Sequence, residues 1–103
     1  MSFNGTEGAP IALSTAAQWT ANYRNSATSG PIKAHFFGRD ILEKILSQDG
    51  CMGIRMYYAI NDEGVQQLIL VGADANERDQ VNGTIADFSS ACPVSCDSAS
   101  PLF

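Results

Sequence analysis

The sequence predicts a small α+β domain in which two helices pack on an antiparallel sheet of three or four strands, with extended arms at both ends. Three observations support this fold class. Residues 50–74 are typical of a β-hairpin, two earlier segments carry apolar residues at helical spacing, and both ends are rich in small residues or proline. With 103 residues the chain has the length of one domain. We expect an N-terminal arm at 1–10, a single domain at 11–90 and a Cys/Pro-rich tail at 91–103.

The composition is that of a folded globule with an acidic second half. Hydrophobic residues make up 45% of the chain and charged residues 17%, whereas disordered chains contain fewer of the first and more of the second. The net charge is −5, and residues 61–103 contain seven acidic residues against one basic residue, Arg78. Such a surface repels a phosphate backbone, and the chain has no basic run. We therefore expect no nucleic-acid binding.

The first helix is expected to begin near residue 14. Ser14 or Thr15 can cap it, and Thr15 with Gln18 fits a capping box. The apolar face of the helix carries Ala16, Trp19 and Tyr23. The polar run at 25–31 ends the helix and forms a loop.

A short strand and a second helix follow. Residues 32–37 alternate between apolar and polar positions, which predicts a strand. Asp40 is expected to cap the second helix with Glu43 as its capping-box partner, and Gly50 follows the end of that helix. Its apolar stripe consists of Ile41, Leu42, Ile45 and Leu46.

Residues 54–71 are expected to form the central hairpin. The sequence 61–64 suits a type I turn with Gly64 in the left-handed bulge position. That turn sets the register and predicts which side chains face each other. The predicted pairs are Tyr58 with Leu68, Tyr57 with Ile69, and Met56 with Leu70.

Both faces of this hairpin are largely apolar. One face carries Met56, Tyr58, Ile60, Leu68 and Leu70, and the other carries Tyr57, Ala59, Ile69 and Val71. The two helices can cover one face, so the tail, the N-terminal arm or another subunit is expected to cover the other. We therefore expect Tyr57, Ile69, Val71 and Arg55 to contribute to an interaction surface, with a second copy or another protein as partner.

Arg55 is unusual because it stands among apolar neighbours on a predicted central strand. An edge position explains it structurally, as does an ion pair with Asp40, Glu43 or Asp87. The functional explanation is a contact with an anion or a partner.

The last part of the chain predicts one more strand and an irregular tail. Val81 and residues 84–88 are candidates for a third strand after the polar turn at 73–79. Pro93 and Pro101 exclude regular structure from the tail.

The three cysteines, Cys51, Cys92 and Cys96, allow several kinds of chemistry. With His35 as a fourth ligand they could hold zinc, although C-x3-C is not the usual zinc spacing. A disulfide could tie the tail to Cys51, which would leave an odd thiol and would require an oxidising compartment. Cys51 and His35 also have the residue types of a thiol nucleophile and its base. The structural alternative is buried or unreactive thiols.

The chain resembles a family of short bacterial proteins of about its own length. The resemblance rests on HFFGRDILEKIL, the core motif GC-x-GIR-x-YY, LILVGADAN and the Cys/Pro tail, and it spans residues 11–102. The family is uncharacterised. The resemblance implies a bacterial protein in which the three cysteines act together, and it implies no activity, substrate or catalytic residue.

These observations lead to an expectation about location and function. The first residues lack the basic and apolar segments of a signal peptide, and the longest apolar stretch, 68–71, is too short to span a bilayer. We expect a cytoplasmic protein that binds no membrane and no cofactor, with signal-independent export as an alternative. Its expected function is that of a non-catalytic protein-binding or self-assembling module. The alternatives are a thiol- or zinc-dependent protein and an acidic inhibitor or immunity-type protein that binds a basic partner.

Overall fold

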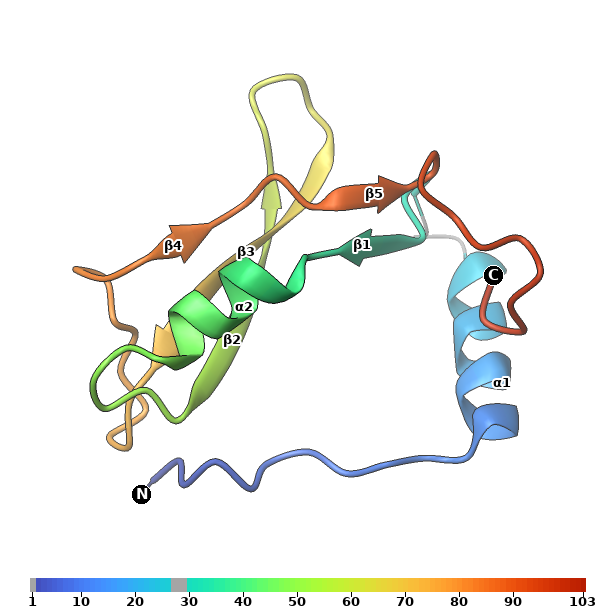
Figure 1. Ribbon diagram of the computed structural model, residues 1–103. Coiled ribbons are helices and arrows are strands. Elements are labelled where there is room, and N and C mark those ends of the chain that lie inside the picture. The colour runs from blue at the N-terminus through green and yellow to red at the C-terminus, as the bar shows by residue number, and fades with distance from the viewer. Residues whose placement is uncertain (1, 27–29) are drawn as a thin grey trace. The chain divides into compact units, whose positions relative to one another are not determined.

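The computed structural model describes residues 2–26 and 30–103 and confirms the predicted α+β class (Figure 1). The chain divides into two compact units. One contains residues 2–7 and 37–89, and the other contains residues 8–36 and 90–103. In chain order the elements are α1 (Leu13–Arg24), β1 (Ala34–Phe36), α2 (Arg39–Leu46), β2 (Gly53–Ile60), β3 (Gln66–Ala73), β4 (Ile85–Ala86) and β5 (Ser90–Cys92).

The first unit is built on a three-stranded antiparallel sheet in the order β2-β3-β4. The predicted hairpin register is confirmed, because Tyr58 lies opposite Leu68 and the other predicted pairs also form. The turn has the expected geometry. Gly64 donates its N–H to the C=O of Asn61 at 3.0 Å and has a φ of 80°, which glycine adopts without a steric penalty.

The core of the first unit lies between α2 and one face of the hairpin. Ile45 of α2 and Leu70 of β3 are fully buried, and Ala86 of β4 completes the centre of the cluster. Burying an isoleucine or leucine side chain stabilises a fold by about 1.5–3 kcal/mol, so this contact holds α2 on the sheet. Around it pack Phe37, Ile41, Leu42, Cys51, Ile54 and Leu68.

The helices begin before the residues that the capping boxes predicted. The N-cap of α1 is Ala12 and the N-cap of α2 is Gly38, and neither provides a side-chain hydrogen bond. The predicted capping boxes are therefore wrong. A cap contributes about 1 kcal/mol, which is less than the burial of the α2 stripe. Packing on the sheet, and not Asp40, decides where α2 begins.

The third strand of this sheet is shorter than predicted. β4 pairs with β3 so that Ala86 lies opposite Leu70 and Ile85 lies opposite Val71. Val81, a candidate for the same strand, lies outside it and is exposed.

The second unit contains α1 and a separate two-stranded sheet, so the strands form two sheets and not one. β1 pairs antiparallel with β5, which places Ala34 opposite Cys92. β5 ends directly before Pro93, which has no backbone N–H to donate to a ladder. The alternation at 32–37 predicted β1, but it did not reveal the distant partner of that strand. The expectation that proline excludes regular structure from the tail is wrong for β5, because the strand ends before Pro93.

The last residues of the chain fold back within the second unit. Arg24 donates from Nη1 to the C=O of Leu102 at 3.1 Å, and the Nζ of Lys33 lies 3.9 Å from the centre of the Phe103 ring. These contacts fasten the tail without a further helix or strand.

Candidate functional site

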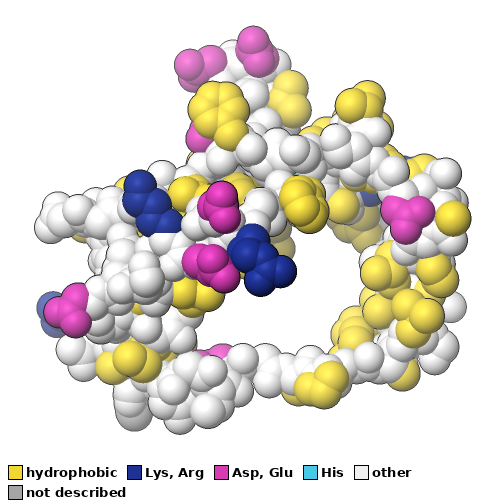
Figure 2. Space-filling view, viewed as in Figure 1, with side chains coloured by type: hydrophobic (Ala, Val, Ile, Leu, Met, Phe, Trp, Pro, Cys, Tyr) yellow, Lys and Arg dark blue, Asp and Glu magenta, His cyan; other side chains and the backbone are white. Residues whose placement is uncertain are grey.

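The outer half of the β2–β3 hairpin exposes a group of large apolar side chains. Tyr58 is 88% exposed and Ile60 is 74% exposed, while Met56 and Tyr57 are also exposed. Figure 2 shows hydrophobic side chains on the projecting hairpin, next to acidic side chains at its tip. Exposed apolar side chains that gather in one place commonly mark an interaction site. We call Met56, Tyr58 and Ile60, which share one face of β2, the hairpin patch.

The length of α2 explains why the patch is exposed. An eight-residue helix is about 12 Å long, and an eight-residue strand is about 27 Å long. Because α2 and β2 both have eight residues, the helix is shorter than one half of the strand. It covers the half that contains Ile54 and leaves the half near the turn open.

β2 is also an edge strand. Among the described residues it pairs with β3 and with no other strand. Asn61 donates its N–H to the C=O of Val65 at 3.0 Å, and in an antiparallel pair the inward-pointing residues alternate with outward-pointing ones. Asn61 and every second residue before it therefore direct their backbone N–H and C=O groups toward β3. The residues between them direct these groups away from β3, and they are Ile54, Met56, Tyr58 and Ile60.

The edge lacks the usual protection against pairing. Natural edge strands carry lysine, proline or a bulge that prevents another strand from adding to them. The sequence of β2 is GIRMYYAI, in which Arg55 is the one charged residue. β2 is thus a long and nearly uncharged edge with apolar side chains.

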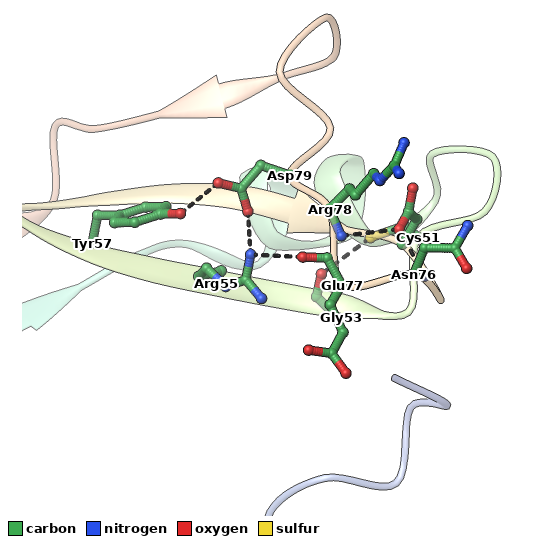
Figure 3. Close-up of polar contacts among 9 residues, drawn as sticks. Cys51, Gly53, Arg55, Tyr57, Asn76, Glu77, Arg78 and Asp79 are labelled. Carbon is green, nitrogen blue, oxygen red and sulfur yellow. Dashed lines mark hydrogen bonds and ion pairs between the residues drawn. The ribbon is translucent and has the colours of Figure 1, made fainter. Parts of the chain in front are cut away.

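Arg55 belongs to a polar cluster on the face of the hairpin opposite to α2. Its Nη1 lies 2.6 Å from Oδ1 of Asp79 and donates a second hydrogen bond to the C=O of Glu77 at 3.2 Å. Tyr57 donates its hydroxyl to Oδ2 of Asp79 at 2.5 Å. Figure 3 shows Arg55 and Tyr57 extending from β2 toward Asp79, which lies in the segment after β3.

This cluster corrects the predicted partners of Arg55. The predicted partners were Asp40, Glu43 and Asp87, whereas the structure pairs Arg55 with Asp79. The edge position predicted for Arg55 is confirmed. The turn after β3 brings Asp79 back beside the sheet, because Asp79 forms a bridge with Ala73. The sequence signal for this return is Asp74, whose Oδ1 accepts the N–H groups of two residues in the turn.

Hydrogen bonds within the cluster shift the pKa values of Asp79 and Tyr57. The hydroxyl of Tyr57, which donates to Asp79, lowers the pKa of that carboxyl below its usual value of 3.8, and the hydrogen bonds and charge of Arg55 lower it further. In return the hydrogen bond to Asp79 raises the pKa of Tyr57 above 10.0. The charges of Arg55 and Asp79 compensate each other, so the cluster adds little net charge to the edge.

The N-terminal residues of the first unit lie beside the start of β2. Phe3 donates its N–H to the C=O of Ala75 at 3.2 Å, and its ring centre lies 5.2 Å from the guanidinium carbon of Arg55. Between these residues and β2 is an open cavity of about 440 Å³. It is lined by Phe3, Gly5, Glu7, Leu46, Met52, Gly53, Ile54, Arg55 and Ala73.

The structure keeps the four predicted interaction residues on one face of the hairpin, where Tyr57 lies opposite Ile69 and Arg55 lies opposite Val71. They differ in exposure, because Tyr57 is exposed on the edge strand whereas Val71, on the inner strand β3, is 3% exposed. Sequence reasoning missed Met56, Tyr58 and Ile60 because it assigned them to the face that a helix would cover. The shortness of the predicted apolar stripe of α2 was the signal that could have revealed them.

The three cysteines do not form one site. Cys92 and Cys96 are joined by a disulfide in the second unit. Cys51 is a free, half-buried thiol in the first unit, and its Sγ donates to the C=O of Gly53 at 3.2 Å. His35 lies on β1 opposite Ala91. Within the described part of the chain, no group of three or more cysteine, histidine or acidic side chains is arranged to hold a metal ion.

Comparisons with protein-family models, with curated proteins and with solved structures give no match for this chain. Over residues 2–26 and 30–103, neither helix combines the length and the apolar character needed to cross a bilayer.

Proposed function

We propose that this protein is a non-catalytic binding or self-assembling module that uses the outer edge of β2 to bind a protein strand. One observation carries the proposal. β2 is an eight-residue edge strand, and the half of it near the turn carries exposed apolar side chains. Strand addition to such an edge is a common mode of protein recognition, in which main-chain hydrogen bonds provide affinity and side chains provide specificity.

The hairpin patch supports this proposal energetically. A strand added to β2 would satisfy the outward backbone groups and remove part of Met56, Tyr58 and Ile60 from water. Complete burial of one such side chain is favourable by about 1.5–3 kcal/mol. The ordering of two chains opposes association by several kcal/mol, so both the backbone bonds and the patch are needed.

The polar groups near the edge favour binding over catalysis. Arg55, Tyr57 and Asp79 are bonded to one another and hold the turn after β3 against β2. In the proposal, their role is to neutralise the charge of Arg55 within one copy. A partner can then approach without separating a charge from its counter-ion.

Light scattering coupled to size-exclusion chromatography tests the proposal. We expect the wild type to associate between micromolar and millimolar concentration, or to bind a fluorescent extended peptide of alternating valine and threonine. Tyr58→Lys places a charge on the edge and should abolish either form of binding. Val81→Lys is the matched control, since Val81 is also exposed but lies outside the strands, and it should leave binding unchanged. A wild type that neither associates nor binds the peptide contradicts the proposal.

A further inference from the structure

We infer that the strand bound by β2 is the β2 of a second copy, paired antiparallel about a twofold axis that passes beside Tyr57. This inference rests on the proposed function and names its partner. It joins two three-stranded sheets into one sheet of six strands. In a twofold interface the same surface of each copy is used twice, so the edge must be complementary to itself. Charge, register and shape each show this self-complementarity.

Charge limits where two copies can meet. The protein carries a net charge of −5, so most of its acidic surface would repel a second copy. β2 is different, because its single charged residue, Arg55, is compensated by Asp79 within the same copy. With the axis beside Tyr57, Arg55 of one copy lies opposite Ala59 of the other, and no like charges face each other across the ladder.

The outward backbone groups select this register. They belong to even-numbered residues, and an antiparallel ladder must join outward residues to outward residues. An axis beside Tyr57 pairs Ile54 with Ile60 and Met56 with Tyr58. All of the strand from Ile54 to Ile60 is then used and Gly53, which has no side chain to contribute, stays outside the ladder. An axis one residue earlier would pair Gly53 with Ala59 and would place Ile60 opposite Met52, which lies outside β2.

The cavity beside the start of β2 gives the third argument. Ile60 is 74% exposed in a single copy. In the proposed register it lies opposite Ile54 of the other copy, and Ile54 and Leu46 line the 440 Å³ cavity. Ile54 and Ile60 belong to the same face of the sheet because their positions differ by an even number. Each copy therefore offers an apolar side chain at one end of β2 and, at the other end, a cavity that Ile54 and Leu46 line on one side.

Cysteine cross-linking tests the register. In the background of Cys51→Ser, we expect Tyr57→Cys to form a disulfide-linked dimer under mild oxidation. The two copies of this residue would form a pair without hydrogen bonds, in which the Cα atoms lie about 4.5 Å apart. The matched variant Ala59→Cys should give little cross-linking, because its two copies would lie about 14 Å apart along the strands. Non-reducing electrophoresis reads both results.

A second pair of variants tests the cavity contact. Ile60→Lys would replace the apolar contact with Ile54 of the other copy by a charge that has to give up its water, and should weaken dimerisation, measured by light scattering, by about tenfold or more. Val65→Lys should not, because Val65 is exposed on the same hairpin but outside β2.

Four outcomes separate this inference from the proposed function. Cross-linking of Ala59→Cys but not of Tyr57→Cys overturns the register. Equal dimerisation of the Ile60→Lys variant and the wild type overturns the cavity contact. A wild type that stays monomeric but binds the valine–threonine peptide overturns the second copy as partner and leaves strand addition standing. Failure of both association and peptide binding overturns the proposed function as well.

Discussion

Tyr57 and Asp79 are joined by a hydrogen bond of 2.5 Å that connects the edge strand β2 to the segment after β3. The same carboxylate pairs with Arg55 through its other oxygen. One acidic side chain thus ties two residues of the edge strand to a turn that lies more than twenty residues further along the chain. The face of the hairpin opposite to α2 is organised by this carboxylate.

We predict that Asp79→Asn lowers the stability of the first unit. The amide keeps the shape of the side chain but removes the charge, which leaves Arg55 without its counter-ion and weakens the bond from Tyr57. The urea midpoint of unfolding, followed by circular dichroism, should fall. Asp87→Asn is the matched control, because it removes an exposed carboxylate outside the cluster. An equal midpoint for both variants would show that the cluster does not contribute to stability.

The cluster predicts a specific pH dependence of stability. Folding lowers the pKa of Asp79 below 3.8, so its contribution is present above about pH 4 and is lost as the pH falls through the folded value. Folding raises the pKa of Tyr57 above 10.0, so its contribution is present below about pH 10 and is lost as the pH rises through the folded value.

The measurement is the stability of the wild type relative to the Asp79→Asn variant as a function of pH. The difference should be constant near neutral pH and shrink at both extremes. In a Tyr57→Phe background, the stability difference caused by Asp79→Asn should no longer shrink at alkaline pH, and it should still shrink at acidic pH. A difference that does not change with pH contradicts the assignment.

Gly72→Ala should destabilise the protein by about 1–3 kcal/mol, because the site has no space for the added methyl group. A Cβ atom at Gly72 would lie 2.5 Å from Oε1 of Gln80 and 3.0 Å from Sγ of Cys51. Gln80 is fixed there, since it accepts a hydrogen bond from Gln48 at 3.1 Å. Gly53→Ala is the control, since a Cβ atom at Gly53 meets nothing within 4 Å. Chemical unfolding of both variants decides the prediction, and equal stabilities would refute it.

The cysteines should differ in their reactivity toward an alkylating reagent. Unfolded but unreduced protein should gain one label, at Cys51, because Cys92 and Cys96 are joined to each other. After reduction all three should react, and peptide mass spectrometry locates each label. Such disulfides persist in oxidising compartments and are reduced in a normal cytosol. Three labels before reduction would contradict the pairing.

The hairpin was predictable because its information is local. The residues that fix its register lie within one turn, and Gly64 adopts the conformation that the turn requires. The stripe of α2 was equally visible, and Ile45 is fully buried as that stripe predicts. Neither conclusion needed any contact between distant parts of the chain.

The exposed part of β2 was less predictable, because it depends on how much of the strand the neighbouring helix covers. The sequence pattern of apolar residues is the same at both ends of β2, yet Ile54 packs against α2 while Ile60 is exposed. Periodicity shows which face a side chain occupies. It does not show how far a neighbouring helix extends.

The sequence alone therefore determined the α+β class, the hairpin register and the apolar stripe of α2, since each follows from residues close together in the chain. Only the tertiary structure decided that Asp79 is the partner of Arg55, that Cys92 bonds to Cys96, that β1 pairs with β5 and that half of β2 stays open. Each of these depends on which distant segments meet. More than one carboxylate, thiol or strand could form each of these contacts, and the fold decides which of them lie close enough to do so.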